Sequence, residues 1–191
     1  MLFRSSIVKE FTTNDKKPEL SGLEKRFDFN SGIFVTLNNK SGLRGCIGFP
    51  LPNKKLYNAL VDASIAAATE DPRFPPVKNE ELDEISFEVT ILSPPKKISV
   101  KENKEYPSEI KVGRDGLIVD NGFSSGLLLP QVPTEYGWNE KEFLEYTCQK
   151  AGLNKDAWKE KSTTISKFQG VIFKEENPNG DILRESSNDL L

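Results

Sequence analysis

The sequence contains no histidine among its 191 residues. Without an imidazole, the chain cannot form the Ser-His-Asp triad or the Cys-His dyad, because both use that ring as their base. Its two cysteines cannot complete the ligand set of a structural zinc site or hold an iron–sulfur cluster. Any chemistry therefore has to use a thiol, carboxylates, lysine, tyrosine or a group that a partner supplies, and we expect no metal or other cofactor.

Long apolar runs and an excess of positive charge are also absent. No run approaches the roughly 20 residues that span a bilayer, and the start of the chain lacks the apolar core and cleavage site of a secretory signal. We therefore expect a cytoplasmic protein without a membrane partner, in which Cys46 and Cys148 are free thiols. The formal net charge is −3 and the pI is near 5.3. Because phosphate-directed binding needs a clustered basic surface, nucleic acid is not expected as a direct high-affinity partner.

The composition, with 36% hydrophobic and 29% charged residues, is that of a globular protein. We expect one domain over 1–191, with an ordered core at about 27–175 and a polar tail at about 177–191. Alternating apolar residues predict a hairpin with arms at 32–37 and 43–49, a strand at 82–92, a second hairpin around Asn121-Gly122 and a last strand at about 165–173. The segment 131–138 is expected to be a loop.

Two helices are predicted from their apolar spacing. One covers 54–69 and is rich in alanine, and the other covers 140–151 with a capping box formed by Asn139 and Glu142. The second helix places Cys148 on its apolar stripe, which favours a core position. The elements together predict an α+β fold in which an antiparallel sheet packs with helices, either as one body or as a larger lobe plus a smaller β-rich lobe at about 94–133.

The most distinctive stretch is Leu-Arg-Gly-Cys-Ile-Gly at 43–48, which we call the hexapeptide. If the strand alternates regularly, Arg44, Cys46 and Gly48 share one face of the sheet. Glycines such as Gly45 and Gly48 leave space above a sheet or let a backbone or ligand approach. An arginine near a thiol stabilises the thiolate, which makes Cys46 a candidate nucleophile. Alternatively, Cys46 is a packing residue and Arg44 pairs with a carboxylate such as Asp71 or Glu135.

The segment 71–76, Asp-Pro-Arg-Phe-Pro-Pro, follows the first predicted helix. Its three prolines fix three φ angles and make it stiff. In one interpretation Asp71 ends the helix, Phe74 fills the core and Arg73 is solvated. In the other, the stiff loop presents Asp71 and Arg73 toward Arg44 and Cys46 as paired charges at a cleft.

The hexapeptide resembles the signature of the AMMECR family. Further matches follow in the family's order at 71–77, 85–94, 115–119 and 126–132, so that the resemblance runs from about residue 32 to residue 173. The family has no settled biochemical activity. Genetic linkage of its prokaryotic members implies Memo-like or radical-SAM-like proteins as partners, and the resemblance also implies a role in RNA-related or regulatory metabolism.

Two hypotheses of different classes follow. In the first, a cleft binds a small anionic or carbonyl-bearing ligand, with Arg44 and Arg73 as anchors, Cys46 as the nucleophile and Asp71 orienting Arg44. Its ligand-binding residues are Arg44, Gly45, Gly48, Asp71, Arg73, Gln131 and Glu135. In the second, the chain is a non-enzymatic scaffold in which the hexapeptide is a docking surface or a folding element. The sequence does not decide between an enzyme and a scaffold, and it does not indicate an oligomeric state.

Overall fold

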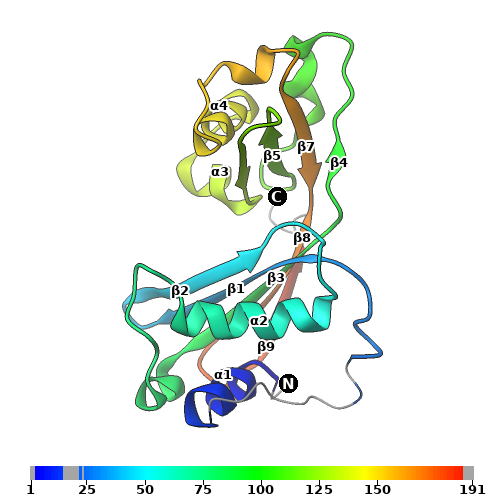
Figure 1. Cartoon of the computed structure of the whole chain (residues 1–191). Helices are drawn as coiled ribbons and strands as arrows, with labels where there is room; N and C mark the ends of the chain where they lie inside the picture. Colours follow the sequence, from blue (N-terminus) through cyan, green and yellow to red (C-terminus); the bar gives the residue numbers. More distant parts are fainter. Residues whose placement is uncertain (1–2, 15–21, 23, 187–191) are drawn as a thin grey trace. The chain divides into compact units, whose positions relative to one another are not determined.

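The computed structural model describes residues 3–14, 22 and 24–186, which divide into two compact units (Figure 1). The first unit comprises residues up to Leu92 and Ile172–Arg184, and the second comprises Ser93–Val171 with Glu185 and Ser186. Each unit has its own sheet. None of the helices in these described residues is long and apolar enough to cross a membrane.

The first unit is built on a five-stranded sheet with the order β2-β1-β3-β8-β9. Its strands are β1 (Gly32–Asn39), β2 (Gly42–Phe49), β3 (Ser86–Leu92), β8 (Gly170–Glu175) and β9 (Ile182–Ser186). Its helical segments are α1 (Phe3–Asn14), α2 (Leu56–Thr69) and the 3-10 helix η1 (Asn79–Glu84). Strands β1 and β2 form the predicted hairpin, and β3 pairs with β1 on the other side.

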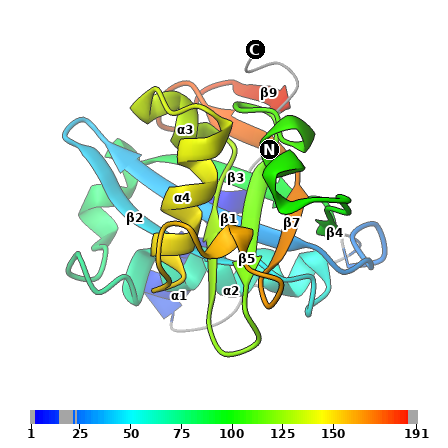
Figure 2. The ribbon, with the colours of Figure 1, turned by 90° about the horizontal axis from the view of Figure 1, so that it is seen from above.

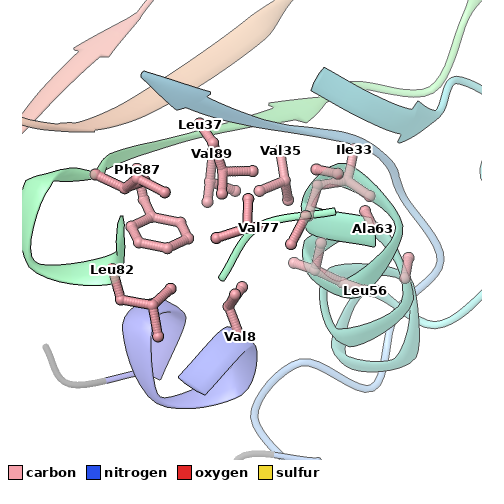
Figure 3. Close-up of a cluster of buried hydrophobic side chains, with 14 residues drawn as sticks. Val8, Ile33, Val35, Leu37, Leu56, Ala63, Val77, Leu82, Phe87 and Val89 are labelled. Atoms are coloured by element: carbon pink, nitrogen blue, oxygen red, sulfur yellow. The ribbon is translucent and has the colours of Figure 1, made fainter. Parts of the chain in front are cut away.

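The core of the first unit lies on one face of this sheet. Ile33, Val35 and Leu37 alternate along β1 and point toward α2, Val77 and Leu82 (Figure 3). Alanines on the inner face of α2 let the helix approach the sheet closely, as their small side chains predict. The segment that follows α2 lies against the C-terminal end of this helix, where the Val77 N–H donates to the Ala68 carbonyl at 2.8 Å.

The second unit is built on a four-stranded sheet with the order β4-β7-β5-β6. Its strands are β4 (Lys96–Lys97), β5 (Gly116–Asp120), β6 (Ser125–Leu128) and β7 (Thr164–Phe168). Its helices are α3 (Gln131–Tyr136) and α4 (Glu140–Lys150), with 3-10 segments η2 (Asn103–Glu109) and η3 (Ala157–Lys159). Helix α4 packs against β5 and β6 (Figure 2).

Helix α4 begins as its sequence predicts. The Asn139 side chain accepts from the N–H groups of Lys141 and Glu142, and the Glu142 carboxylate accepts from the Asn139 N–H at 2.9 Å. This capping box satisfies donors that the first turn of a helix leaves free. Cys148 is completely buried in the core with Phe143 and Leu144, which confirms its predicted packing role.

The α+β prediction is confirmed, and five of the predicted bounds or elements differ. The smaller unit extends to residue 171 and not to 133, because α4 and β7 pack with β5. The strand predicted at 165–173 is two strands, β7 and β8, in different sheets, and that predicted at 82–92 begins at Ser86 after η1. The segment predicted as a loop at 131–138 contains α3, and the predicted polar tail contains β9, which as an edge strand tolerates polar residues.

Candidate functional site

Strand β2 does not alternate regularly through the hexapeptide. Leu37 pairs with Gly45 but Asn38 pairs with Leu43, so that Arg44 is an extra residue in β2. Such a bulge re-aims a side chain. Arg44 reaches the η1 side of the sheet, where Leu82 lies in the core. The prediction that Arg44 and Cys46 share a face is therefore wrong, because regular alternation does not hold across the bulge.

The Arg44 guanidinium is buried, and each of its three nitrogens donates a hydrogen bond. Its Nε and Nη2 donate to the two carboxylate oxygens of Glu81 at 2.8 and 3.1 Å, and its Nη1 donates to the Pro75 carbonyl at 2.9 Å. The hydrogen bond from Arg44 lowers the pKa of Glu81, although burial acts in the opposite direction. Arg44 thus ties η1 and the proline-rich loop to β2. The predicted orientation of Arg44 by Asp71 is wrong, since Glu81 takes that place.

Glu81 was not among the predicted site residues. Its carboxylate also accepts from the Lys78 N–H at 2.9 Å, at the start of η1. The spacing of three residues between Lys78 and Glu81 is that of a capping box, without the usual serine or threonine. This spacing marks a helix start in the sequence, but nothing in it identifies Arg44 as the partner.

Asp71 is buried and holds the backbone of Cys46. Its Oδ2 accepts from the Cys46 N–H at 2.8 Å, and its two oxygens accept from the Arg73 side chain at 2.7 and 3.0 Å. The hydrogen bond from Arg73 is the largest cause that brings the pKa of Asp71 well below its usual range; burial opposes it, and the Cys46 N–H adds to it. The carboxylate is therefore a fixed negative charge and not a proton donor at neutral pH.

Arg73 completes the contact with Cys46. Its Nη2 lies 3.4 Å from the Cys46 carbonyl oxygen, while its side chain remains 54% exposed. Because β2 is an edge strand, Cys46 has no neighbouring strand on that side. Asp71 and Arg73 occupy its N–H and C=O as a further strand would, which protects the edge. The structure thus brings Asp71 and Arg73 together at Cys46, as the second interpretation of the stiff loop expects, but not at Arg44, which pairs with Glu81.

The Cys46 thiol lies on the sheet face opposite α2. The Thr36 hydroxyl donates to its sulfur at 3.3 Å, and Thr36 alternates with the core residues Val35 and Leu37. In register, Thr36 pairs with Cys46 on one side and with Glu88 on the other. A thiol, a hydroxyl and a carboxylate therefore form one row across β2, β1 and β3. We call Cys46, Thr36 and Glu88 the thiol row. Cys46 is only partly buried.

The two glycines of the hexapeptide serve packing. A Cβ on Gly45 would lie 2.1 Å from the carbonyl oxygen of Ala67 in α2. A Cβ on Gly48 would lie 2.4 Å from the Phe34 ring and from the Ile33 carbonyl oxygen. The space that both were predicted to leave for a ligand is filled by the protein itself, so their assignment as ligand-binding residues is corrected.

Gln131 and Glu135 belong to α3 in the second unit. The residues that hydrogen-bond to Cys46, among those that the structure describes, are Thr36, Asp71 and Arg73, and all three belong to the first unit. The Gln131 Oε1 atom is buried without a partner among the described residues. Within the same part of the chain, no group of three or more cysteine, aspartate or glutamate side chains is arranged to hold a metal ion.

The α+β fold matches that of a solved structure. The solved structure of uncharacterized protein PH0010 from Pyrococcus horikoshii is similar, with a TM-score of 0.88 and 46% identity over 96% of this chain and 93% of that chain. A protein of Thermococcus gammatolerans is 55% identical over 81% of this chain and 77% of its own length. A protein of Aquifex aeolicus is 48% identical over 88% of this chain and 86% of its own length.

The model of the AMMECR1 family matches residues 1–173. The chain therefore belongs to the AMMECR1 family, and the resemblance found in the hexapeptide is confirmed.

Proposed function

We propose that this chain binds a small molecule that carries a carbonyl group beside an anionic group, with Cys46 as the nucleophile and Arg73 as the anion anchor. The observation that carries the proposal is that the half-exposed Arg73 guanidinium contacts the backbone carbonyl of Cys46, a partly buried residue of an edge strand that carries a free thiol. Arg73, and not Arg44, is the anchor, because Arg44 is buried on Glu81.

The electrostatics support this pairing. The pKa of Arg73 is raised chiefly by its hydrogen bond to Asp71, and in smaller part by the charge of a Cys46 thiolate. The guanidinium is therefore within electrostatic reach of the sulfur. The Thr36 hydroxyl donates to that sulfur at 3.3 Å, which holds the thiol in place on its face of the sheet.

The simplest reaction at such a site is reversible addition to an aldehyde. The Cys46 sulfur forms a bond to the carbonyl carbon while the C=O π bond breaks, and the oxygen takes up the proton that the thiol released. The product is a hemithioacetal, with no net oxidation and no co-reactant. Arg73 binds the neighbouring carboxylate by charge-assisted hydrogen bonds.

Alkylation by two reagents that differ only in charge tests this proposal. Iodoacetate carries a carboxylate and iodoacetamide does not. We expect the ratio of the iodoacetate rate to the iodoacetamide rate to be about threefold larger at Cys46 than for free cysteine, a difference typical of one exposed ion pair. The ratio should return to that of free cysteine in Arg73→Ala and stay raised in the matched control Arg114→Ala. Glyoxylate, an aldehyde with a carboxylate, should slow both alkylations.

Cys148 provides the internal reference. It is completely buried, and burial raises the pKa of its thiol to about 11, so that it should not react near pH 8. Cys148→Ser keeps the assay specific. A rate ratio that Arg73→Ala leaves unchanged, or a Cys46 that reacts only after denaturation, contradicts the proposal.

A second candidate is a non-enzymatic scaffold in which the hexapeptide is a folding element. The observation in its favour is that Arg44, Gly45 and Asp71 all contact residues of the first unit. Arg44 donates to Glu81, Gly45 packs against Ala67, and Asp71 accepts from the Cys46 N–H. Its partners would be the Memo-like or radical-SAM-like proteins that family association implies, in RNA-related or regulatory metabolism. A Cys46 that does not react in the native protein, or one whose alkylation glyoxylate does not slow, favours this candidate.

A further inference from the structure

Three aromatic rings form a continuous stack on the second unit. The Tyr136 and Trp138 rings have centroids 4.9 Å apart and planes inclined by 17°. The Trp138 and Tyr146 rings have centroids 3.9 Å apart and planes inclined by 13°. Trp138 is the middle ring, since each tyrosine stacks on it. We call these three side chains the aromatic stack.

The local backbone holds this stack in place. Helix α3 ends at Gly137, whose φ of 68° is left-handed and suits glycine. The Trp138 N–H then donates to the Pro133 carbonyl at 2.8 Å, and Asn139 opens α4. Trp138 also packs against the core of the second unit. The stack is therefore fixed before any ligand binds, which reduces the entropy cost of binding.

The stack is exposed at its ends. Tyr136 is 68% exposed and Tyr146 is 42% exposed. Aromatic surface of both rings therefore faces solvent. An exposed aromatic group of this size commonly marks an interaction site. The faces of aromatic rings carry negative electrostatic potential, which attracts cations.

The charge around the stack has the same sign. Residues 131–150 contain four glutamates against two lysines, with no arginine and no aspartate. Glu135 is exposed and directly precedes Tyr136. Its carboxylate, like the ring faces, favours a cationic ligand and disfavours a phosphate group. The planar shape of the stack favours a planar cation, and among protein side chains arginine has the planar cation that stays fully charged at neutral pH.

We propose that the aromatic stack binds an arginine side chain of a partner protein, with its guanidinium on the ring of Tyr136 and its charge balanced by Glu135. This site uses other residues than the thiol row, so the failure of either proposal leaves the other standing. It gives Glu135 a binding role apart from Cys46.

A peptide titration tests this proposal. The probes are acetyl-Gly-Arg-Gly-Arg-Gly-amide and the matched peptide with lysine in both positions, and the signal is Trp138 fluorescence in a Trp158→Phe background. We expect saturable binding of the arginine peptide about fivefold tighter than that of the lysine peptide, because the guanidinium stacks and the ammonium does not.

Variants assign the binding to the stack. Tyr136→Ala should weaken the arginine peptide about fivefold, as the loss of one cation–π contact predicts. Glu135→Gln should weaken it about twofold and reduce its salt dependence, as one exposed ion pair predicts. Phe123→Ala is the matched control, since Phe123 is an aromatic residue of the same unit that is 98% exposed.

Three results overturn the proposal: no saturable binding, equal affinity for the two peptides, or an affinity that neither Tyr136→Ala nor Glu135→Gln changes. Binding of an oligouridylate in place of the arginine peptide overturns it as well, and would assign the stack to nucleobases. Circular dichroism of each variant shows that its fold is retained.

Discussion

Both units bring a helix against a strand through a glycine. In the first unit, a Cβ on Gly45 would lie 2.1 Å from the backbone of Ala67 in α2. In the second, a Cβ on Gly126 would lie 2.3 Å from the backbone of Ala151, at the end of α4. The two units differ in the sequence and length of their helices and strands. In both, the close approach of the helix requires a glycine in the strand, because any side chain there would meet the helix backbone.

Both units also bury an aspartate that accepts from an arginine and from a backbone N–H. Asp71 binds the Cys46 N–H across 25 residues of sequence, whereas Asp115 binds the Lys111 N–H only four residues away. Burial alone would raise the pKa of Asp115, but the Arg114 side chain and the Lys111 N–H bring it below its ordinary value. The first aspartate thus stabilises a long-range contact and the second a local turn.

The two cysteines complete the comparison. Cys46 lies partly exposed on an edge strand, whereas Cys148 is completely buried on α4. In the first unit, the glycine, the aspartate contact and the cysteine meet at the adjacent residues Gly45 and Cys46. In the second unit, they lie on β6, on a loop and on α4. The hexapeptide is therefore the point where helix, loop and strand of the first unit are joined.

The largest expected effect comes from filling the two glycine contacts. Gly45→Ala and Gly126→Ala should each lower the free energy of unfolding by about 3 kcal/mol, because the added methyl meets backbone and not a side chain that can turn away. Urea unfolding followed by circular dichroism measures this loss. Both tryptophans lie in the second unit, so tryptophan fluorescence reports on that unit.

Gly42→Ala is the control for this pair. Its Cβ would meet nothing within 4 Å, but its φ of +107° is unfavourable for alanine. We expect a loss of about 1 kcal/mol from backbone strain alone. A loss in Gly45→Ala no larger than that of Gly42→Ala would show that α2 moves away from β2 at little cost.

The second effect separates the two aspartates. Asp71→Ala and Asp115→Ala should each cost about 2 kcal/mol, because each removes a buried carboxylate that accepts from an arginine and from a backbone N–H. Only Asp71→Ala should also change the iodoacetamide rate of Cys46 and speed the hydrogen exchange of its amide, measured by NMR. Equal changes at Cys46 in both variants would contradict the assignment of Asp71 to the edge of β2.

The smallest effect concerns pH. Since the pKa values of Asp71 and Asp115 are lowered in the folded state, their stabilisation is complete above the unfolded pKa of about 4 and is lost as pH falls below it toward the folded values. The free energy of unfolding should therefore decrease between about pH 5 and pH 2. Asp71→Asn and Asp115→Asn should each make this decrease shallower by about 1 kcal/mol in urea titrations. A slope that neither variant changes would assign the acid sensitivity to other carboxylates.

The sequence predicts the elements whose signals are local. The hairpin of β1 and β2, helix α2 and the capping box of α4 all follow from apolar spacing, turn residues and caps. Cys148 was placed correctly in the core for the same reason. These predictions hold because each depends on residues within one turn or one strand.

The site depends on contacts that no local pattern contains. The bulge at Arg44 exists only in relation to β1, and one extra residue is enough to separate Arg44 from Cys46. Glu81 binds Arg44 across 37 residues, and it belongs to a 3-10 segment whose last three residues lie in the range predicted as a strand. Helix α3 is short and contains Pro133, which in sequence favours a loop.

The order of strands in the first unit has a consequence for protein synthesis. Its sheet combines β1, β2 and β3 with β8 and β9, which follow the whole of the second unit in the sequence. A nascent chain leaves the ribosome from its N-terminus, and domains fold as their residues emerge. The four strands of the second unit have all emerged once β7 has, before the first unit has received its last two. The unit that starts later in the sequence can thus complete its sheet earlier.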